Sequence, residues 1–181
     1  SDVYHYANTS QLAWMRAEAA SVLGQVVLRA DNEYGRQLND EALHYFESQG
    51  MHDMMANELF MSGLSWAGQH DTDSLQKAEQ QFLRSESAAA QALNPFGITY
   101  AKAGLCRVQV ELGRVKEALH SCSTSLQRLK GIGDVTEYST IVNYAAALLA
   151  DDSPEQAMDL LAPLTKEWPG FDVRYYGYRF Y

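Results

Sequence analysis

Residues 116–122 have the sequence Lys-Glu-Ala-Leu-His-Ser-Cys, and this pattern of residue types occurs four times along the chain. Each copy has a small alanine, followed four positions later by a larger apolar residue or a cysteine. The copies are 40–46, 76–82, 116–122 and 155–161, with Ala42, Ala78, Ala118 and Ala157 as their alanines. The alanines lie 36, 40 and 39 residues apart. A period of this length indicates a protein built from stacked repeats.

The segments that carry these copies have the pattern of helices. Apolar residues recur at spacings of three and four, alternating runs of β-branched residues are missing, and only four prolines interrupt the chain. We predict helices over residues 10–30, 34–48, 53–68, 72–93, 97–112, 115–130, 135–150 and 153–167. For the first helix we predict an apolar stripe of Leu12, Met15, Ala19, Leu23, Val26 and Val27.

Helix packing explains why an alanine marks each repeat. A small residue lets two helices approach closely at their crossing, and the residue one turn later fills the space beside it. One pair cannot bury both of its faces, so it stacks on the next pair. The sequence therefore predicts an all-α superhelix of about four antiparallel helix pairs. We expect one domain, residues 1–181, with repeats at 10–50, 53–94, 97–131 and 135–169. A non-repeating helical bundle is the alternative.

The segment Leu112-Gly113-Arg114-Val115-Lys116-Glu117-Ala118-Leu119 resembles the tetratricopeptide repeat family, which has a glycine, four residues and then an alanine. Pro169, twelve residues after Ala157, stands where that family often has a closing proline. The sequence departs from the family at Leu105-Cys106, where Leu-Gly is usual. The spacing near 40 also exceeds the usual 34, and this is similar to the longer-repeat variant of bacterial signalling proteins and transcription regulators.

Composition and charge restrict the chemistry. The net charge of −9 disfavours phosphate backbones, so we expect no nucleic-acid partner. No run of about 18 apolar residues occurs, so we expect no membrane span. The five histidines form no HExxH or HxH motif, and no nucleophile–base pair is visible, so we expect neither a metal, a cofactor nor catalysis. The Gly131-Ile132-Gly133 motif follows a helix, and we interpret it as a helix end and turn.

The two cysteines, Cys106 and Cys122, lie at facing positions of one predicted helix pair. We favour two small buried apolar residues, and a disulfide is the alternative. Two cysteines make no disulfide framework, which suits a cytoplasmic protein. Residues 1–10 also lack the basic start and apolar middle of a signal peptide, although a removed signal peptide is an alternative.

The aromatic segment 170–181 is the least ordinary part of the sequence. It holds Phe171, Tyr175, Tyr176, Tyr178, Phe180 and Tyr181. We expect it to cap the last repeat or to begin a further repeat of a longer solenoid, since the end of a stack needs a cover. A dedicated partner-binding segment is the alternative.

The resemblance implies a protein-interaction or adaptor module, which binds a peptide or a partner protein in a concave groove. The first helix of each pair forms the wall of such a groove. The candidate partner-binding residues are Glu58, Ser62, Tyr100, Arg107, Glu111 and Ser139. The alternative is a ligand-sensing region of a larger signalling or transcription-regulating protein, with further repeats or an output domain elsewhere in that protein.

Overall fold

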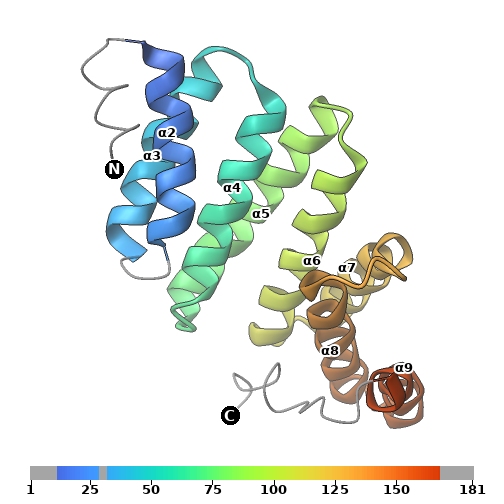
Figure 1. Cartoon of the computed structure of the whole chain (residues 1–181). Coiled ribbons are helices and arrows are strands. Elements are labelled where there is room, and N and C mark those ends of the chain that lie inside the picture. The colour runs from blue at the N-terminus through green and yellow to red at the C-terminus, as the bar shows by residue number, and fades with distance from the viewer. Residues whose placement is uncertain (1–11, 29–31, 168–181) are drawn as a thin grey trace. The chain divides into compact units, whose positions relative to one another are not determined.

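The computed structural model describes residues 12–28 and 32–167, and it contains no strand among them. The eight described helices are α2 (Ala13–Val27), α3 (Asn32–Ser48), α4 (His52–Ala67), α5 (Thr72–Gln91), α6 (Pro95–Glu111), α7 (Val115–Leu129), α8 (Val135–Ala150) and α9 (Pro154–Glu167) (Figure 1). Their ends lie within three residues of the predicted ones. The all-α fold class is therefore confirmed. Pro169 and the aromatic segment 170–181 lie outside the described residues.

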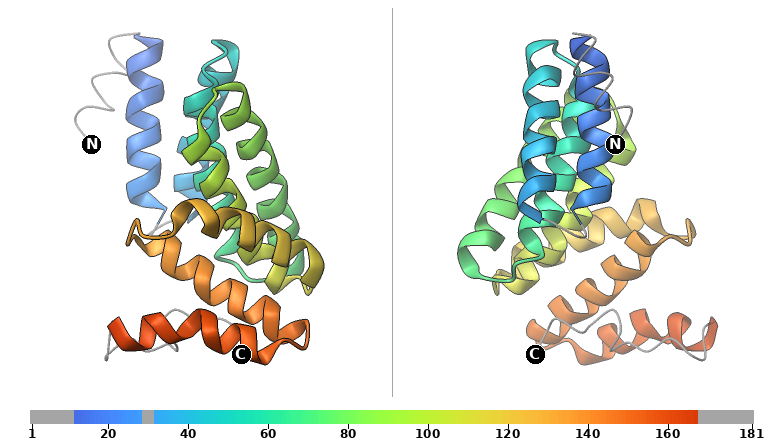
Figure 2. Two further views of the ribbon diagram at one scale, coloured as in Figure 1. Left: turned by 90° about the vertical axis from the view of Figure 1, so that its right-hand side faces the viewer. Right: turned by 60° about the vertical axis from the view of Figure 1, so that its left-hand side comes forward.

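The helices pack on their neighbours in the sequence. The chain divides into two compact units, Ser1–Ala101 and Lys102–Tyr181, with the boundary inside α6. In the first unit α2 packs on α3, α3 on α4, and α4 on α5; in the second unit α7 packs on α8, and α8 on α9 (Figure 2). Each unit is thus a run of antiparallel helices held by contacts between consecutive elements, as expected for a superhelical arrangement.

The four repeat alanines are buried at the helix crossings. Ala42, Ala78, Ala118 and Ala157 are each at most 1% exposed. Ala42 and Phe46 share one core cluster with Ala17 and Ala20 of α2.

The second pair shows how close the helices come. A Cβ atom added to Gly63 of α4 would lie only 2.6 Å from the Phe82 ring of α5. A small residue facing a large one therefore sets the distance between the two helices of a pair.

Side-chain caps fix where several helices begin. The Asp71 carboxylate accepts a hydrogen bond from the backbone N–H of Ser74 at 2.9 Å, and Asp134 accepts one from Glu137 at 2.8 Å. The Asn94 side-chain oxygen accepts one from the N–H of Gly97 at 2.8 Å. Because Asn94 caps α6 and Pro95 fits its first turn, this helix starts two residues earlier than predicted.

The predicted stripe of the first helix faces the core only in part: Leu23 packs against the cluster that contains Ala17 and Ala20, but other members do not. Leu12 is 42% exposed and Val26 68% exposed, whereas the buried positions of α2 are Ala17, Ala20, Ser21 and Gly24. The small side chains face α3 because they allow a close approach there. Of the larger apolar side chains, Leu12, Val22 and Val26 are left exposed.

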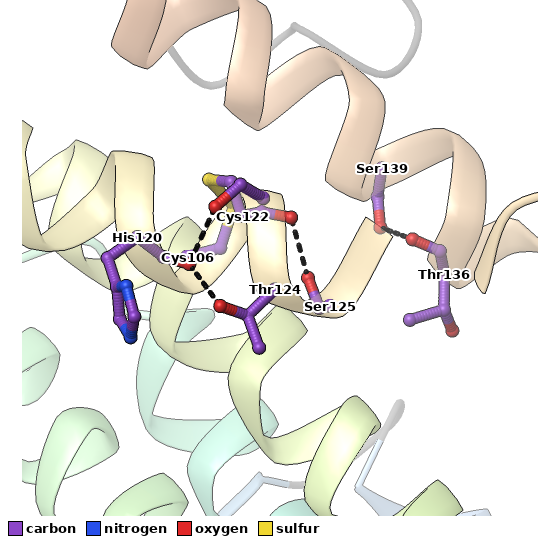
Figure 3. Close-up of a disulfide and its surroundings, with 8 residues drawn as sticks. Cys106, His120, Cys122, Thr124, Ser125, Thr136 and Ser139 are labelled. Carbon is purple, nitrogen blue, oxygen red and sulfur yellow. Dashed lines mark hydrogen bonds between the residues drawn. A yellow bond between two sulfur atoms is a disulfide. The ribbon is translucent and has the colours of Figure 1, made fainter. Parts of the chain in front are cut away.

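Cys106 and Cys122 form a disulfide that joins α6 to α7 (Figure 3). Their burial was predicted, and both are 0% exposed. Their pairing was the less favoured alternative, and the prediction of two free buried thiols is therefore corrected. Cys122 lies four residues after Ala118, the place that Phe82 has relative to Ala78. Cys122 thus has the position in α7 that Phe82 has in α5.

We predict that Ala78→Leu destabilises the fold, because no space exists for a larger side chain at this crossing. The expected loss in the free energy of unfolding is about 1–3 kcal/mol, the usual effect of overpacking a core. Chemical denaturation followed by circular dichroism measures it. Ala90→Leu is the matched control, since Ala90 lies on the exposed side of the same helix. An equal effect of both changes would contradict the close crossing.

We predict that replacing both cysteines by alanine lowers the free energy of unfolding by about 3 kcal/mol, because the cross-link closes a short loop of 16 residues. The double variant Cys106→Ala, Cys122→Phe should recover part of this loss, since it places a large residue against a small one. Denaturant titration of the three proteins tests both statements. Wild-type stability in the double-alanine variant would contradict them.

Candidate functional site

The six candidate residues lie on the first helices of three pairs. Two of them, Glu58 and Ser62, are on α4; Tyr100, Arg107 and Glu111 are on α6; and Ser139 is on α8. The unit boundary separates the first three from the last three. The structure therefore presents them as two groups, one in each unit.

Glu58 and Ser62 are interior residues. Glu58 is 0% exposed and Ser62 5% exposed. The Ser21 hydroxyl of α2 donates a hydrogen bond to Glu58 Oε1 at 2.5 Å, and the Asn57 amide donates to the same oxygen at 3.3 Å. Oε2 has no hydrogen-bond partner. The carboxyl group thus joins α4 to α2 inside the first unit.

The interior of the first unit is unusually polar around these helices. Ser21, Asn39, Glu58, Ser62 and Ser65 are all at most 6% exposed. Neither side-chain atom of Asn39 that can form a hydrogen bond has a partner. Its oxygen lies where a Cβ atom at Gly24 would be, so the amide fits against α2 only because residue 24 is glycine. Such unpartnered groups oppose folding, and close packing elsewhere must offset them.

Cationic side chains connect α3, α4 and α5. Arg36 of α3 donates a hydrogen bond to the Ser65 hydroxyl of α4 at 3.0 Å, and its guanidinium lies 4.3 Å from the centroid of the Trp66 ring. Lys77 of α5 lies 4.5 Å from the centroid of the same ring. These contacts attach α3 and α5 to α4 through cation–π attraction.

Burial raises the pKa of the Glu58 carboxyl, and hydrogen bonds from Ser21, Asn57 and Gln25 oppose this rise. The dominant cause is the loss of water around the charged form. Although a serine hydroxyl contacts a carboxyl here, the pair is enclosed by helices and cannot meet a substrate in this arrangement.

The other four candidates are partly exposed. The centroid of the Tyr100 ring lies 6.1 Å from that of the Phe60 ring. The Phe60 centroid lies 5.7 Å from that of the Phe82 ring. A row of three aromatic rings therefore extends from the interior of the first unit to Tyr100.

In the second unit, Arg107 and Glu111 form an ion pair at 3.0 Å, with side chains that are 24% and 8% exposed. The Ser139 hydroxyl donates to the backbone carbonyl of Thr136 at 3.1 Å (Figure 3). Arg107 and Glu111 are one turn apart on α6, so the ion pair lies along a single helix with the arginine as its more exposed member.

The Gly131-Ile132-Gly133 motif is a turn, as interpreted from the sequence. Both Glu137 carboxylate oxygens accept hydrogen bonds at 2.7 Å, one from the N–H of Gly131 and one from that of Gly133. The carboxylate therefore occupies the backbone donors that a phosphate would need. Within residues 12–28 and 32–167, no group of three or more potential ligands could hold a metal ion. No helix in these ranges is long and apolar enough to cross a bilayer.

Comparison with known proteins gave no relative: no family model matches the chain, and no curated protein matches it. The likeness to tetratricopeptide repeats therefore stays a prediction based on the residues quoted above.

Sequence reasoning did not find Ser21 and Asn39, which share the polar interior with Glu58. A signal was present in the sequence, since Ser21 follows Ala17 and Ala20 at helical spacing and lies on their face of α2. The larger apolar residues on the opposite face obscured this signal.

We predict that Glu58→Gln stabilises the protein at pH 7 by about 1–3 kcal/mol, because it removes a buried charge with an unpartnered oxygen. In the wild type the folded state holds the Glu58 proton more tightly than the unfolded chain does. Stability should therefore fall as pH rises from about 4.5 through the raised pKa.

Denaturation between pH 4 and pH 8 tests this prediction. The difference between wild type and Glu58→Gln should vanish at the acid end. Glu117→Gln is the control, since the Glu117 side chain is 60% exposed and should shift stability little at any pH. A Glu58→Gln variant that gains no stability over the wild type between pH 4 and pH 8 would contradict the raised pKa of the buried Glu58 carboxyl.

Proposed function

We propose that the chain is a protein-interaction or adaptor module that holds a peptide or a partner protein against the first helices of its pairs. The observation that supports this most is that the helices pack on their neighbours in the sequence. This packing leaves partly exposed side chains on α6 and α8, each of which is the first helix of its pair. Stacked helix pairs form extended surfaces of this kind.

The burial of Glu58 and Ser62 narrows the proposed contact residues. These two side chains are buried within their own unit, so Tyr100, Arg107 and Ser139 are the better candidates, and the Glu111 side chain is only 8% exposed. Tyr100 offers an aromatic ring supported by Phe60, and Arg107 offers a partly exposed guanidinium that Glu111 holds in place. Aromatic and arginine side chains are the residues that most often carry binding energy at interfaces.

We propose no catalytic role and no nucleic-acid partner. The contact of the Ser21 hydroxyl with the Glu58 carboxyl is buried, and the net charge of −9 repels phosphate backbones. The alternative, a ligand-sensing region of a larger regulator, depends on sequence beyond these 181 residues and stays a prediction.

Localisation is a separate proposal. We predicted a cytoplasmic protein, but the buried Cys106–Cys122 disulfide favours maturation in an oxidising compartment. Alkylation of free thiols in protein taken directly from the source cell distinguishes the two. Two alkylated cysteines would support the cytoplasm, and none would support an oxidising compartment.

We predict that a photo-crosslinking amino acid at Ser139 or Tyr100 captures one discrete partner in the source cell, because both positions lie on the proposed contact helices. The same residue at Met158 of α9 is the control, since Met158 is 71% exposed but lies on a second helix of a pair. Gel electrophoresis and mass spectrometry identify the products. Equal capture at all three positions, or none at Ser139 and Tyr100, would contradict the proposal.

A further inference from the structure

The residue that directly follows each repeat alanine lies where one helix pair meets the next. These residues are Leu43, Glu79, Leu119 and Met158. Leu43 of α3 shares a core cluster with Leu59 of α4 and Ala89 of α5, the two helices of the next pair. Leu119 of α7 packs against a cluster that belongs to α8 and α9, namely Ala145, Leu148 and Ala157. This position of the repeat therefore carries a contact between consecutive pairs.

Met158 is exposed where its counterparts are covered. Leu43 is 8% exposed and Glu79 9% exposed, and Leu119 is partly buried, whereas Met158 of α9 is 71% exposed. The described residues end at position 167, so they contain no further pair that could cover it (Figure 1). Leu161, almost one turn along the same side of α9, is also partly exposed. The repeat therefore predicts a helix against this side of α9.

The segment that follows α9 begins like the links that lead to other first helices. Gly50 and Gly131 each lie two residues after the end of a second helix, with positive φ angles of 65° and 86°. Glycine in this conformation ends a helix and turns the chain toward the next one. Gly170 lies three residues after the end of α9. Residues 171–181, which follow it, supply the large aromatic side chains that a further helix would bury.

The turn also determines which residues of two consecutive helices meet. In an antiparallel helix pair, residues that are about equally far from the turn face each other. Leu43 lies seven residues before Gly50, and Ala56, of the same cluster, lies six residues after it. Leu119 lies twelve residues before the corresponding glycine, and Ala145 lies fourteen residues after it.

The same rule matches α9 to the aromatic segment. Met158 lies twelve residues before Gly170, and Tyr181 lies eleven residues after it. Leu161 lies nine residues before this glycine, and Tyr178 lies eight residues after it. Both exposed apolar positions of α9 therefore fall opposite a tyrosine.

We propose that residues 171–181 pack as a helix antiparallel to α9, with Tyr181 against Met158 and Tyr178 against Leu161. The occupant is this segment because a link of three residues holds it beside α9 at an effective concentration on the order of millimolar. A separate chain of the same chemistry would have to compete with it. The proposal does not depend on the partner-binding surface proposed above.

Disulfide trapping in the full chain tests the register. Both natural cysteines are bonded to each other, so introduced cysteines are the free thiols of the sequence. Met158→Cys with Tyr181→Cys should form a second disulfide within one chain under mild oxidation. Met158→Cys with Phe171→Cys is the matched control and should react at least tenfold more slowly, because Phe171 lies at the other end of the segment. A photo-crosslinking amino acid at Met158 should likewise attach to this segment and not to a partner.

Two results of the trapping experiment would overturn the proposal. Equal rates for the two cysteine pairs would mean that the segment has no fixed register on α9. A disulfide-linked dimer in place of the bond within one chain would mean that a second copy covers Met158.

Oxidation of Met158 by dilute hydrogen peroxide tests the cover itself, since an exposed methionine forms the sulfoxide more readily. The full chain with Tyr178→Ser and Tyr181→Ser should oxidise at Met158 at least threefold faster than the wild type. Tyr176→Ser is the matched control variant, because Tyr176 falls on the opposite side of the proposed helix. Met51, 40% exposed in the first unit, should keep its rate in all three proteins. The same Met158 rate in all three would overturn the proposal.

Discussion

The first two helix pairs are built around close crossings, at which small side chains of one helix face a large side chain of the other. In the first pair Ala17 and Ala20 share a cluster with Phe46, and in the second pair Gly63 contacts the ring of Phe82. In the third pair Cys122, four residues after Ala118 as Phe82 is after Ala78, forms the disulfide with Cys106. The short distance between the helices brings their backbones together and determines which side chains are left for the next helix in the stack.

The same close crossings explain the polar interior of the first unit. Small residues on α2 leave little apolar surface to bury, and Ser21, Asn39 and Glu58 fill positions that leucine or valine would otherwise take. A buried carboxyl with an unpartnered oxygen costs stability, so its presence is not explained by packing energy alone. Its hydrogen bond from Ser21 does, however, fix how α4 sits against α2.

Helix positions and the alanine register could be predicted from the sequence because they depend on local signals: spacing, caps and turn residues. The inward face of α2 could not, since both of its faces are apolar and size, rather than polarity, decides which one is buried. The interior position of Glu58 depends on contacts with α2, which lies 37 residues earlier. The sequence placed Cys106 and Cys122 at facing positions, which allowed a disulfide as an alternative. Only the packed structure shows that the two sulfur atoms are bonded.

Each helix is stabilised mainly by contacts with its neighbours in the sequence and not by a single common core. The most direct test is amide hydrogen exchange, measured by mass spectrometry. The protein is compared with the Cys106–Cys122 bond intact and with this bond reduced. We expect protection to fall in α6, α7 and their neighbour α8, with α2, α3 and α4 unchanged. A loss of protection spread evenly over all eight described helices would contradict the account.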